Sequence, residues 1–578
     1  MTTRERTETT TPKMKGQEFL AETVRRSHTK ALFFVPTFLY PTLVELAEDP
    51  IKRVLCHSEK AAAYMADGYA QATNSPTIVI TQGGPGATNL FAGMADAWES
   101  HTPMLAITPL IPTARYHGNS YQEVYTDFRS VTKYDAEVRG VDRLAEFLGK
   151  AYREMTTGAP RPVHLYLDGA HEAMDFAFDS GYLDERYFSF PAFRPRADDD
   201  SVAEAVRRLS SAERPVIVSG RGAISSGAWA EVTALAERLG IPVTTSLGGK
   251  GSIDERHPLA LGVSGSYRRP SADESIHGAD LVLYIGSHQG GASTLMKQMP
   301  KPGGDIIHID INPAQPGFNY PNVLPLIGDA RTVVGQMLEA AGAGVPGGHA
   351  AWIAEQQDVL KAWREQEQDH MFGNAVPIRP EQLAVEVVKA CPDDTLFLAD
   401  TGYSAAWSGA FMDLPAGKNY LPCEGSLSWA FPAAIGAKAG VPDRPVVAWI
   451  GDGGFWYHMS ELETAVRNKI NVVTVVLNNH ALVFDTHLLQ AFWSASHDVE
   501  MLSEFGDTDF ATIAEAVGAF GVKVTDPADI GRAVQEALNA DRPAVVDVTI
   551  DHAAVAPVAF MAGQGSRGGM LTAPEKMR

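Results

Sequence analysis

The stretch that decides the fold is RPVVAWIGDGGFWYHMSELETAVRNKINVVTVVLNNHAL, from Arg444 to Leu482. An apolar run (PVVAWI) ends in a glycine turn, a mixed polar and apolar stretch follows, and a second apolar run (VVTVVL) ends in two asparagines. This pattern predicts a strand, a helix and a second strand parallel to the first. Because parallel strands end at the same edge of a sheet, we expect the turn and the asparagines to lie close together.

The turn Gly451-Asp452-Gly453-Gly454 combines the features of an anion site and of a metal site. Glycines let backbone N–H groups approach an anion, and the start of a helix favours negative charge. The Asp452 carboxylate, the Asn479 amide oxygen, a backbone carbonyl, a water and two phosphate oxygens would complete an octahedral Mg²⁺ shell. An ordinary strand–turn–helix explains a lone G-D-G better, but the asparagines after the next strand favour the metal site.

Outward from this stretch, strand-like and helix-like runs alternate and form three blocks. Strands are predicted in residues 15–189 at ALFFV, RVLCH, PTIVIT, PMLAIT and PVHLYL, with helices such as EKAAAYMADGYAQA and VDRLAEFLGKAYREM. In residues 201–343 they are predicted at RPVIVSG, PVTTSL, DLVLYIG and DIIHIDI. In residues 379–552, after a predicted helix WIAEQQDVLKAWREQEQ, they are predicted at DTLFLAD, PVVAWIG, VVTVVLNN and PAVVDVTI. Such alternation indicates parallel sheets with helical crossovers.

Two segments with the composition of linkers separate the blocks, FPAFRPRADDD over residues 190–200 and GAGVPGGHA over residues 342–350. The first and third blocks are similar in length and rhythm, which suggests a duplication. We therefore predict an α/β protein with three doubly wound parallel-sheet domains. A polar, mobile N-terminus over residues 1–14 and a C-terminal tail over residues 553–578 flank them.

Composition narrows the functions open to such a fold. The chain has 578 residues, with 48 Lys and Arg and 70 Asp and Glu, so its net charge is 48 − 70 = −22. Binding to nucleic acid or to an anionic membrane needs a basic footprint, so we expect neither partner. No apolar run approaches the roughly 20 residues of a membrane span, and the N-terminus lacks the apolar core of a secretory signal. Three cysteines without metal-ligand spacing fit a reducing cytosol.

Four segments resemble one enzyme family. GDGGF…LNN resembles the diphosphate and metal motif of thiamine-diphosphate (ThDP) enzymes. HSEKAAAYMADGYAQA followed by TQGGPGATN is similar to the pyrimidine-binding domain of the acetolactate synthase and pyruvate oxidase branch. SYQEVYTDFRSVTKYD resembles the F-Q-E…I-T-K segment of that branch, and EGSLSWAFPAAIGAKAG the segment that holds the aminopyrimidine. The segments follow the family's order over residues 15–552, so the resemblance implies pyrimidine-binding, middle and diphosphate-binding domains.

The resemblance implies roles for particular residues. Glu59 matches the activating glutamate, whose carboxylate hydrogen-bonds the aminopyrimidine so that the 4′-nitrogen can take the C2 proton. Without the other segments, Glu59 would be interpreted as a glutamate at the start of a helix, where its interaction with the helix dipole stabilises the helix by about 0.3–1 kcal/mol. Leu427 matches the apolar residue that holds the cofactor bent, with the Gly425 carbonyl receiving the 4′-amino group, although leucines are usually core residues. The other implied cofactor residues are Gly402, Tyr403, Ser404, Gly451, Asp452, Gly453, Gly454, Asn479 and Ala481, and Asp452, Asn479 and Ala481 are the implied metal ligands.

Substrate residues follow from the same resemblance. Gln122 matches a glutamine near the reacting centre and is predicted to be catalytic together with Glu59. His57-Ser58 departs from the Arg-His that relatives commonly carry, and the segment from His480 to Trp493 departs from their glycine-rich form, so specificity is expected there. Single histidines are more often structural than chemical. With that alternative open, the candidates for substrate contact are His117, Tyr121, His480, Phe484, Asp485 and His487.

The tail GQGSRGGMLTAPEKMR has two interpretations. It reads as a disordered terminus, or as a lid whose Arg567 meets an anionic substrate, as in ThDP enzymes that act on acyl-CoA thioesters. The middle block has a GRGAISSGA turn, a weak signal for a nucleotide. The resemblance leaves FAD, ADP or no ligand open there.

The function predicted first is ThDP- and Mg²⁺-dependent decarboxylation of a 2-oxo acid with carboligation, as in acetolactate synthase. The alternatives are a 2-hydroxyacyl-CoA lyase or acyl-CoA decarboxylase, and a non-catalytic binding subunit with the same fold. In this branch the glutamate and the diphosphate site come from opposite subunits. The resemblance therefore implies a homodimer at minimum and a homotetramer as the commonest assembly.

Overall fold

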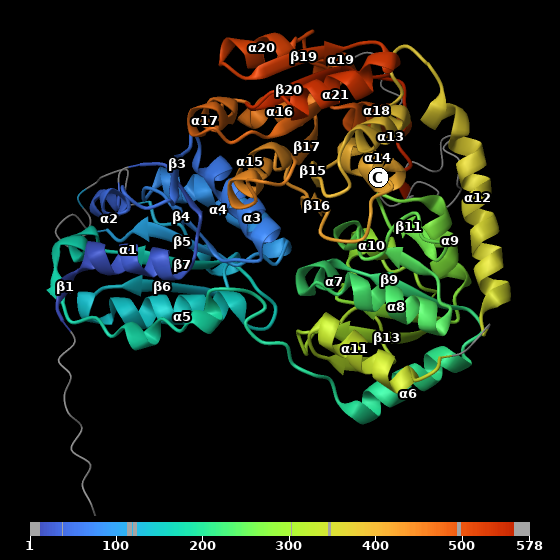
Figure 1. The fold of residues 1–578 in the computed structure, drawn as a ribbon, viewed down its shortest axis with the longest axis horizontal. Helices are drawn as coiled ribbons and strands as arrows, with labels where there is room; N and C mark the ends of the chain where they lie inside the picture. Colours follow the sequence, from blue (N-terminus) through green and yellow to red (C-terminus); the bar gives the residue numbers. More distant parts are fainter. Residues whose placement is uncertain are drawn as a thin grey trace, which may run out of the picture. The chain divides into compact units, whose positions relative to one another are not determined.

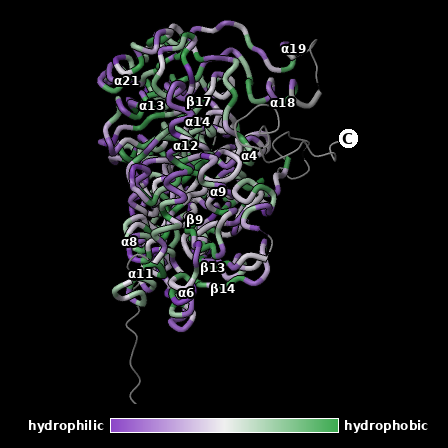
Figure 2. Tube along the Cα trace, turned by 90° about the vertical axis from the view of Figure 1, so that its right-hand side faces the viewer, coloured by the Kyte–Doolittle hydropathy of each residue, from purple (hydrophilic) through white to green (hydrophobic). Residues whose placement is uncertain are grey.

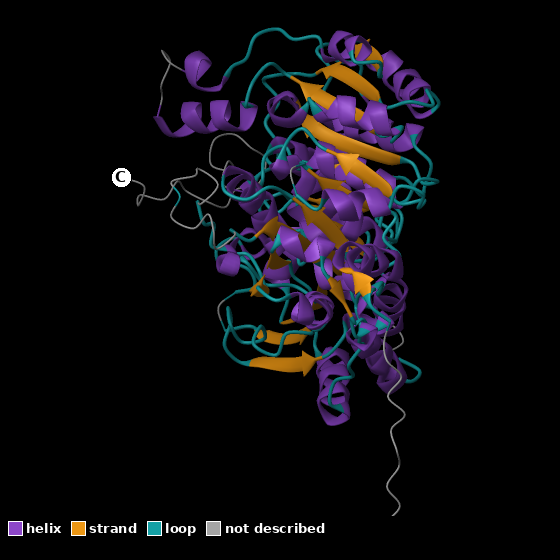
Figure 3. Cartoon of the chain, turned by 90° about the vertical axis from the view of Figure 1, so that its left-hand side faces the viewer, coloured by secondary structure: helices purple, strands orange, loops and turns teal. Residues whose placement is uncertain are grey.

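A computed structural model describes residues 12–36, 38–111, 118, 124–301, 303–344, 348–493 and 499–559. The chain divides into two units. One comprises Met1–Ala192 with Ala439–Val441, and the other comprises Phe193–Lys438 with Pro442–Arg578. Figure 3 shows that the strands lie between layers of helices, as expected for sheets whose two faces are both covered.

The first unit is built on a parallel sheet of six strands in the order β3-β2-β4-β5-β7-β6 (Figure 1). The strands are β2 (Ala31–Phe34), β3 (Lys52–Leu55), β4 (Thr77–Ile80), β5 (Met104–Pro109), β6 (Tyr134–Val138) and β7 (Val163–Leu167). A small antiparallel pair joins β1 (Met14–Lys15) to β8 (Asp175–Phe176). The α-helices are α1 (Gly16–Arg26), α2 (Tyr40–Glu45), α3 (Glu59–Thr73), α4 (Pro85–Glu99) and α5 (Leu144–Thr156).

Helices α3 and α4 of the first unit approach each other closely. A Cβ atom added at Gly93 of α4 would lie 2.3 Å from the Cβ of Ala63 on α3, so only glycine fits at this contact. Helix α4 starts at Pro85, directly after Gly84 with φ 61°, and proline is well suited to a first helical position. The close packing places the first turn of α3 beside the first turns of α4.

The second unit contains two sheets. In the middle domain the strands lie in the order β11-β10-β9-β12-β13-β14, and all pairs are parallel. They are β9 (Pro215–Ser219), β10 (Val243–Thr245), β11 (Ala260–Val263), β12 (Leu281–Ile285), β13 (Asp305–Asp310) and β14 (Val323–Ile327). Numbered along the domain, this order is 3-2-1-4-5-6, the arrangement of dinucleotide-binding sheets. The helices are α6 (Asp199–Ser211), α7 (Arg221–Ser226), α8 (Trp229–Leu239), α9 (Pro270–Gly278), α10 (Gly291–Thr294) and α11 (Ala330–Ala341), and α12 (Ala350–Phe372) connects this domain to the next.

The other sheet of this unit has the order β16-β15-β17-β18-β20-β19, again with parallel pairs. Its strands are β15 (Leu396–Ala399), β16 (Tyr420–Pro422), β17 (Val446–Gly451), β18 (Val473–Asn478), β19 (Phe520–Val524) and β20 (Ala544–Thr549). The helices are α13 (Pro380–Ala390), α14 (Tyr403–Phe411), α15 (Ala430–Gly440), α16 (Asp452–His458), α17 (Glu461–Asn468), α18 (Val483–Trp493), α19 (Val499–Ser503), α20 (Phe510–Ala516) and α21 (Ile530–Leu538). The predicted fold class, three doubly wound parallel-sheet domains, is confirmed.

The helices cover the sheets with one apolar face. In α21 the buried residues Ile530, Ala533, Val534 and Ala537 recur with helical spacing and join the core under β19 and β20. Figure 2 shows hydrophilic and hydrophobic residues alternating along such helices. Among the described residues, we find no helix that is both long enough and apolar enough to span a membrane.

Candidate functional site

The predicted phosphate turn lies at the carboxyl end of β17. This strand is buried up to Gly451, and α16 begins at Asp452. A Cβ atom added at Gly453 would lie 2.5 Å from Cδ2 of Leu482, so a side chain there would push against the segment that follows β18. Glycine at this position therefore allows the turn and that segment to meet.

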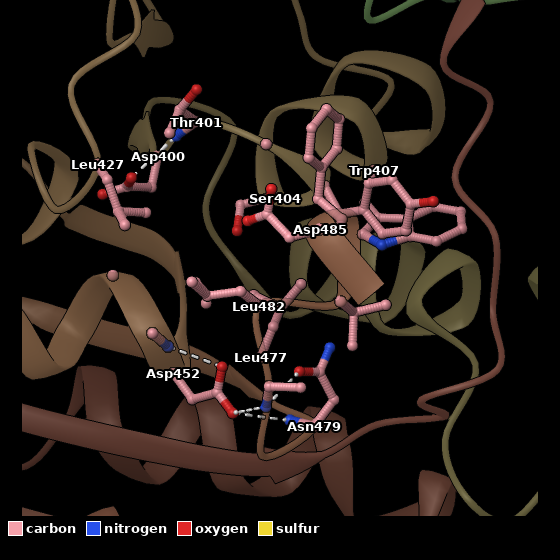
Figure 4. Close-up of a pocket in the computed structure, with 18 of the residues that line it drawn as sticks. Asp400, Thr401, Ser404, Trp407, Leu427, Asp452, Leu477, Asn479, Leu482 and Asp485 are labelled. Atoms are coloured by element: carbon pink, nitrogen blue, oxygen red, sulfur yellow. Dashed lines mark hydrogen bonds between the residues drawn. The ribbon is translucent and has the colours of Figure 1, made fainter. Parts of the chain in front are cut away.

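Asp452 gathers the predicted metal ligands around its carboxylate (Figure 4). Its Oδ2 accepts hydrogen bonds from the backbone N–H groups of Asn479 and Ala481, both at 3.2 Å, and its Oδ1 accepts one from Gly453 at 2.7 Å. The side-chain Oδ1 of Asn479 accepts from the Ala481 N–H at 3.3 Å. The Asp452 carboxylate, the Asn479 amide and the Ala481 N–H thus lie together at the carboxyl edge of the sheet, where the spacing predicted that Asp452 and Asn479 would meet.

The electrostatics of this point suit a cation. Asp452 is 3% exposed, and burial raises the pKa of its carboxyl group to about 6, although several backbone N–H groups oppose the shift. Those recorded donors are neutral, so they leave the negative charge uncompensated. A divalent cation would neutralise that negative charge, and carboxylate and amide oxygens are the ligands that Mg²⁺ prefers. The residues therefore fit the predicted metal.

A cavity of about 300 Å³ lies over this point. Figure 4 shows Asp452 and Asn479 on one side of it and Asp400, Ser404 and Leu427 on the other. The predicted residues that line the cavity are Gly402, Tyr403, Ser404, Leu427, Gly451, Asp452, Gly453, Gly454, Asn479, Ala481, Phe484 and Asp485. Residues far apart in the sequence thus surround one space at the carboxyl edge of a parallel sheet, where such sheets bind ligands.

Asp400, which the sequence analysis did not single out, fixes the loop that carries Leu427. It follows β15 directly, is 1% exposed, and accepts hydrogen bonds from the backbone N–H groups of Ser428 at 2.9 Å and Ala430 at 3.0 Å. Ser428 has φ 78°, a left-handed conformation that favours glycine, so the loop is held in an unfavourable shape. The available signal was a carboxylate at the end of a buried strand, the same signal that identified Asp452.

Aromatic side chains form another wall of the cavity. The Tyr403 hydroxyl hydrogen-bonds Nδ1 of His487 at 2.9 Å, and its ring packs edge-on against Phe484 with 5.6 Å between centroids. Burial raises the pKa of Tyr403 and lowers the pKa of His487. The neutral pair of hydroxyl donor and imidazole acceptor is therefore favoured. Tyr267, a middle-domain residue, also lines the cavity, and no sequence pattern pointed to it.

Glu59 lies in the first unit, at the first position of α3. Its Oε2 accepts a hydrogen bond from Nδ2 of Asn89 at 3.1 Å. A Cβ atom added at Gly86 would lie 3.1 Å from its Oε1, so a side chain there would crowd the carboxylate. Gly86 and Asn89 both belong to the TQGGPGATN segment, so the two motifs of this domain meet at Glu59. Asn89 was not predicted individually as a site residue.

The remaining predicted residues are placed differently. Gly425, with φ 131°, lies on the loop before Leu427 but does not line the cavity. His480 is also outside the lining, and its Nε2 lies 3.7 Å from Asp507. Asp485 lines the cavity, and burial raises the pKa of its carboxyl group. The residues His117, Tyr121, Gln122 and Arg567 lie outside the described residues.

The segment after β18 forms a helix in place of a glycine-rich loop. Helix α18 runs over Val483–Trp493, and α19 brings the chain back, so that Leu482 N–H donates to Ser503 at 2.7 Å and Phe505 N–H to His480 at 2.6 Å. Figure 2 shows α18 and α19 projecting from the body of this unit. This hairpin contributes Val483, Phe484 and Asp485 to the cavity.

Comparison with known proteins identifies all three domains. Residues 14–130 match the N-terminal TPP binding domain of thiamine pyrophosphate enzymes, residues 202–337 match their central domain, and residues 400–548 match their C-terminal TPP binding domain. Thiamine pyrophosphate is another name for ThDP.

Relatives align over most of the chain. The acetolactate synthase large subunit of Corynebacterium glutamicum is 30% identical over 514 residues, which cover 86% of this chain and 80% of the relative. The probable acetolactate synthase large subunit of Methanocaldococcus jannaschii is 29% identical over 559 residues, 94% of this chain and 93% of the relative. The isozyme 3 large subunit of Escherichia coli is 27% identical over 510 residues, 87% and 88% respectively. This chain therefore belongs to the thiamine-diphosphate enzyme family, in its acetolactate synthase branch.

Proposed function

We propose that this enzyme uses ThDP and Mg²⁺ to decarboxylate a 2-oxo acid and to join the remaining acyl group to an aldehyde or ketone. The observation that carries the proposal is the convergence of Asp452, Asn479 and the Ala481 backbone beside a cavity lined by a glycine turn. The names of the relatives support the reaction class. When bound, the thiazolium of ThDP supplies a carbanion that is stable enough to break and form bonds next to a carbonyl.

Different residues of the chain would hold different parts of the cofactor and its metal. Asp452, Asn479 and the Ala481 carbonyl would hold the metal, while N–H groups of the turn at Gly453 and Gly454 favour the diphosphate. Leu427 supplies an apolar side chain to the cavity, held in place through Asp400. Glu59 would hold a proton at its carboxylate, next to the aminopyrimidine, with Asn89 orienting it.

A complete site would need two copies of the chain. The family resemblance places Glu59 of one subunit opposite the Asp452 of another, so we propose a homodimer at minimum and a homotetramer as the full assembly. Co-expression of Glu59→Gln and Asp452→Asn chains tests this. Random pairing gives one intact site in half of the dimers, so roughly a quarter of wild-type activity should return. Sites made within one chain would leave the mixture inactive.

The middle domain is proposed to bind a nucleotide, FAD or ADP. Sheets with this strand order commonly bind a ligand between the ends of their first and fourth strands, which are β9 and β12 here, and this supports the proposal. Near this edge the hydroxyl of Ser219 and both amide atoms of Gln289 are buried without recorded partners in the described part of the chain, which fits a polar ligand. Three expectations from the sequence stay predictions. They are the domain bounds 15–189, 201–343 and 379–552, the lid over residues 553–578, and the cytosolic location.

The deciding experiment is a mass-spectrometric screen of the purified enzyme with ThDP and Mg²⁺. It offers 2-oxo acids with and without carbonyl acceptors. We expect CO₂ release with a joined product, and in Glu59→Gln a loss of turnover on the order of 10²- to 10⁴-fold with the fold intact. The control, Glu48→Gln, changes an exposed glutamate of the same domain and should leave turnover unchanged.

Other outcomes separate the rival functions. Products from 2-hydroxyacyl-CoA thioesters but not from 2-oxo acids would replace the proposal by the CoA lyase or acyl-CoA decarboxylase. Wild-type turnover in Glu59→Gln would remove Glu59 from the chemistry. Absence of calorimetric ThDP binding in the presence of Mg²⁺ would favour a binding subunit.

A further inference from the structure

A second group of metal-type ligands lies in the second unit, apart from the cavity. Glu367 and His370 are three residues apart in the last turns of α12, and Glu381 lies in the first turn of α13. One ligand atom from each of the three side chains lies within 4.8 Å of the other two. A tetrahedral zinc site with bonds of about 2.0 Å places ligand atoms roughly 3.3 Å apart. Small side-chain rotations would therefore bring these atoms around one ion.

Burial makes this group unusual. Glu381 is 2% exposed and Glu367 is 8% exposed, whereas acidic side chains are rarely buried to this extent. The Oε1 of Glu381 accepts from Arg379 at 2.6 Å, but its Oε2 is buried and has no hydrogen-bond partner recorded in the described part of the chain. An unpaired buried carboxylate oxygen is costly, so it points to a ligand that completes the site.

The local charges also favour a cation. Arg379 binds Glu381 and also donates to Asp551 at 3.0 Å. The single positive charge of Arg379 is therefore shared by two carboxylates, and Glu367 adds a third carboxylate to the group. Nδ1 of His370 lies 2.9 Å from Oε2 of Glu367, so an imidazole nitrogen and a carboxylate oxygen already face each other within this group.

We propose that Glu367, His370 and Glu381 bind one divalent transition-metal ion, with zinc the best match. One imidazole nitrogen and two carboxylate oxygens are ligands that zinc accepts, and a water can take the fourth position. The His370 side chain is 29% exposed, so solvent and metal can reach the group. Arg379 would stay outside the metal shell and orient Glu381 through its hydrogen bond.

The ion would have a structural role. Helix α12 follows the middle domain and packs against both α9 of that domain and α13 of the next (Figure 1). Ligands on α12 and α13 would therefore brace the connecting helix against the C-terminal domain. Asp551, which pairs with Arg379, directly precedes His552 in the chain. Nδ1 of His552 lies 3.2 Å from the carbonyl of Asn479.

The test uses the full chain loaded with ThDP and excess Mg²⁺, so that the cavity site is filled first. Zinc is added, unbound metal is removed, and bound zinc per chain is measured by mass spectrometry of the metal. We expect one zinc per chain, and a zinc affinity in His370→Gln that falls by more than about 100-fold. We estimate this loss because removal of a residue that only orients a ligand already lowers metal affinity by roughly 10- to 100-fold. Glu365→Gln, an exposed glutamate of the same helix, is the matched control and should bind zinc normally.

A second measurement keeps the proposal falsifiable if zinc affinity proves hard to compare. Cobalt(II) is substituted for zinc, and its visible absorption reports the coordination of the metal. We expect the bands of a four- or five-coordinate site in the wild type and in Glu365→Gln, and their loss in Glu367→Gln and Glu381→Gln. No retained zinc in the wild type, or equal zinc in His370→Gln, would overturn the proposal. Neither readout depends on catalysis.

Discussion

In the first domain the strands lie in the order β3-β2-β4-β5-β7-β6, and in the third in the order β16-β15-β17-β18-β20-β19. Numbered along each domain, both orders are 2-1-3-4-6-5. The middle domain, with 3-2-1-4-5-6, is the exception. The two matching sheets therefore offer matching loops at their carboxyl edges, and these loops can be compared one by one.

The matching loops carry different chemistry. The loop after the second strand holds Glu59 in the first domain and Leu427 in the third. The loop after the third strand is rich in glycine in both, but it contains Gln82 in the first domain and the buried Asp452 in the third. The difference teaches that the sheet sets where a loop residue lies, whereas the side chain at that position would decide the proposed role of the loop, proton transfer at Glu59 or metal binding at Asp452.

The largest expected effect tests the third-strand loops. Asp452→Asn removes the only negative charge of the glycine turn, so we expect Mg²⁺-dependent ThDP affinity to fall by at least about 100-fold in calorimetric titration. Gln82→Ala, in the matching loop of the first domain, should leave the Mg²⁺ dependence unchanged. Equal losses in the two variants would break the comparison.

A smaller effect is expected at Asp400, which holds the loop of Leu427. In Asp400→Asn the side-chain NH₂ would face the N–H of Ala430, so one of the two loop hydrogen bonds is lost. We expect kcat to fall by up to about 100-fold, because small misplacements at a reacting centre are costly. The metal requirement should stay unchanged. Asp443→Asn, on the surface of the same domain, is the control, and a similar loss there would contradict the role of Asp400.

The close packing of α3 and α4 gives a third prediction. Gly93→Ala forces a Cβ atom against Ala63, so we expect the free energy of unfolding to fall by about 1–3 kcal/mol in denaturant titrations. Because Glu59 begins α3, turnover should fall as well. At Gly531 of α21 a Cβ atom would meet nothing within 4 Å, so Gly531→Ala should be neutral or stabilising. Unchanged stability in Gly93→Ala would show that the helices can separate without cost.

The smallest effect concerns the middle domain. Burial lowers the pKa of His308 from 6.5 to about 4, so the unfolded chain binds a proton at a higher pH than the folded chain. Stability is therefore full above pH 6.5 and is lost as the pH falls toward 4. At pH 5.5 the loss is about 1 kcal/mol.

The variant His308→Leu should lose less stability than the wild type between pH 7.5 and pH 5.5, as measured by urea unfolding at both pH values. Glu59→Gln serves as the comparison, since its change lies in another domain. An identical pH dependence in wild type and His308→Leu would show that His308 does not titrate as described.

Much of the fold could be predicted because central strands are continuous apolar runs. Every predicted run matches a strand, from ALFFV at β2 to PAVVDVTI at β20. Apart from the short β1–β8 pair, the strands that the sequence analysis did not name are β6, β11, β14, β16 and β19, and all five lie at sheet edges. Edge strands are covered on fewer sides, so they can carry polar residues, as YDAEV does in β6, and their sequence signal is weak.

For the site, the sequence by itself determined the turn of Asp452 and the asparagines after β18, because residues at the ends of adjacent parallel strands meet wherever such a sheet forms. Only the tertiary structure decided that Asp400 holds the Leu427 loop, that Tyr267 of the middle domain lines the same cavity, and that Glu381 meets His370. These contacts join residues whose spacing in the chain follows no period. They depend on how whole domains and helices pack, which local sequence patterns do not encode.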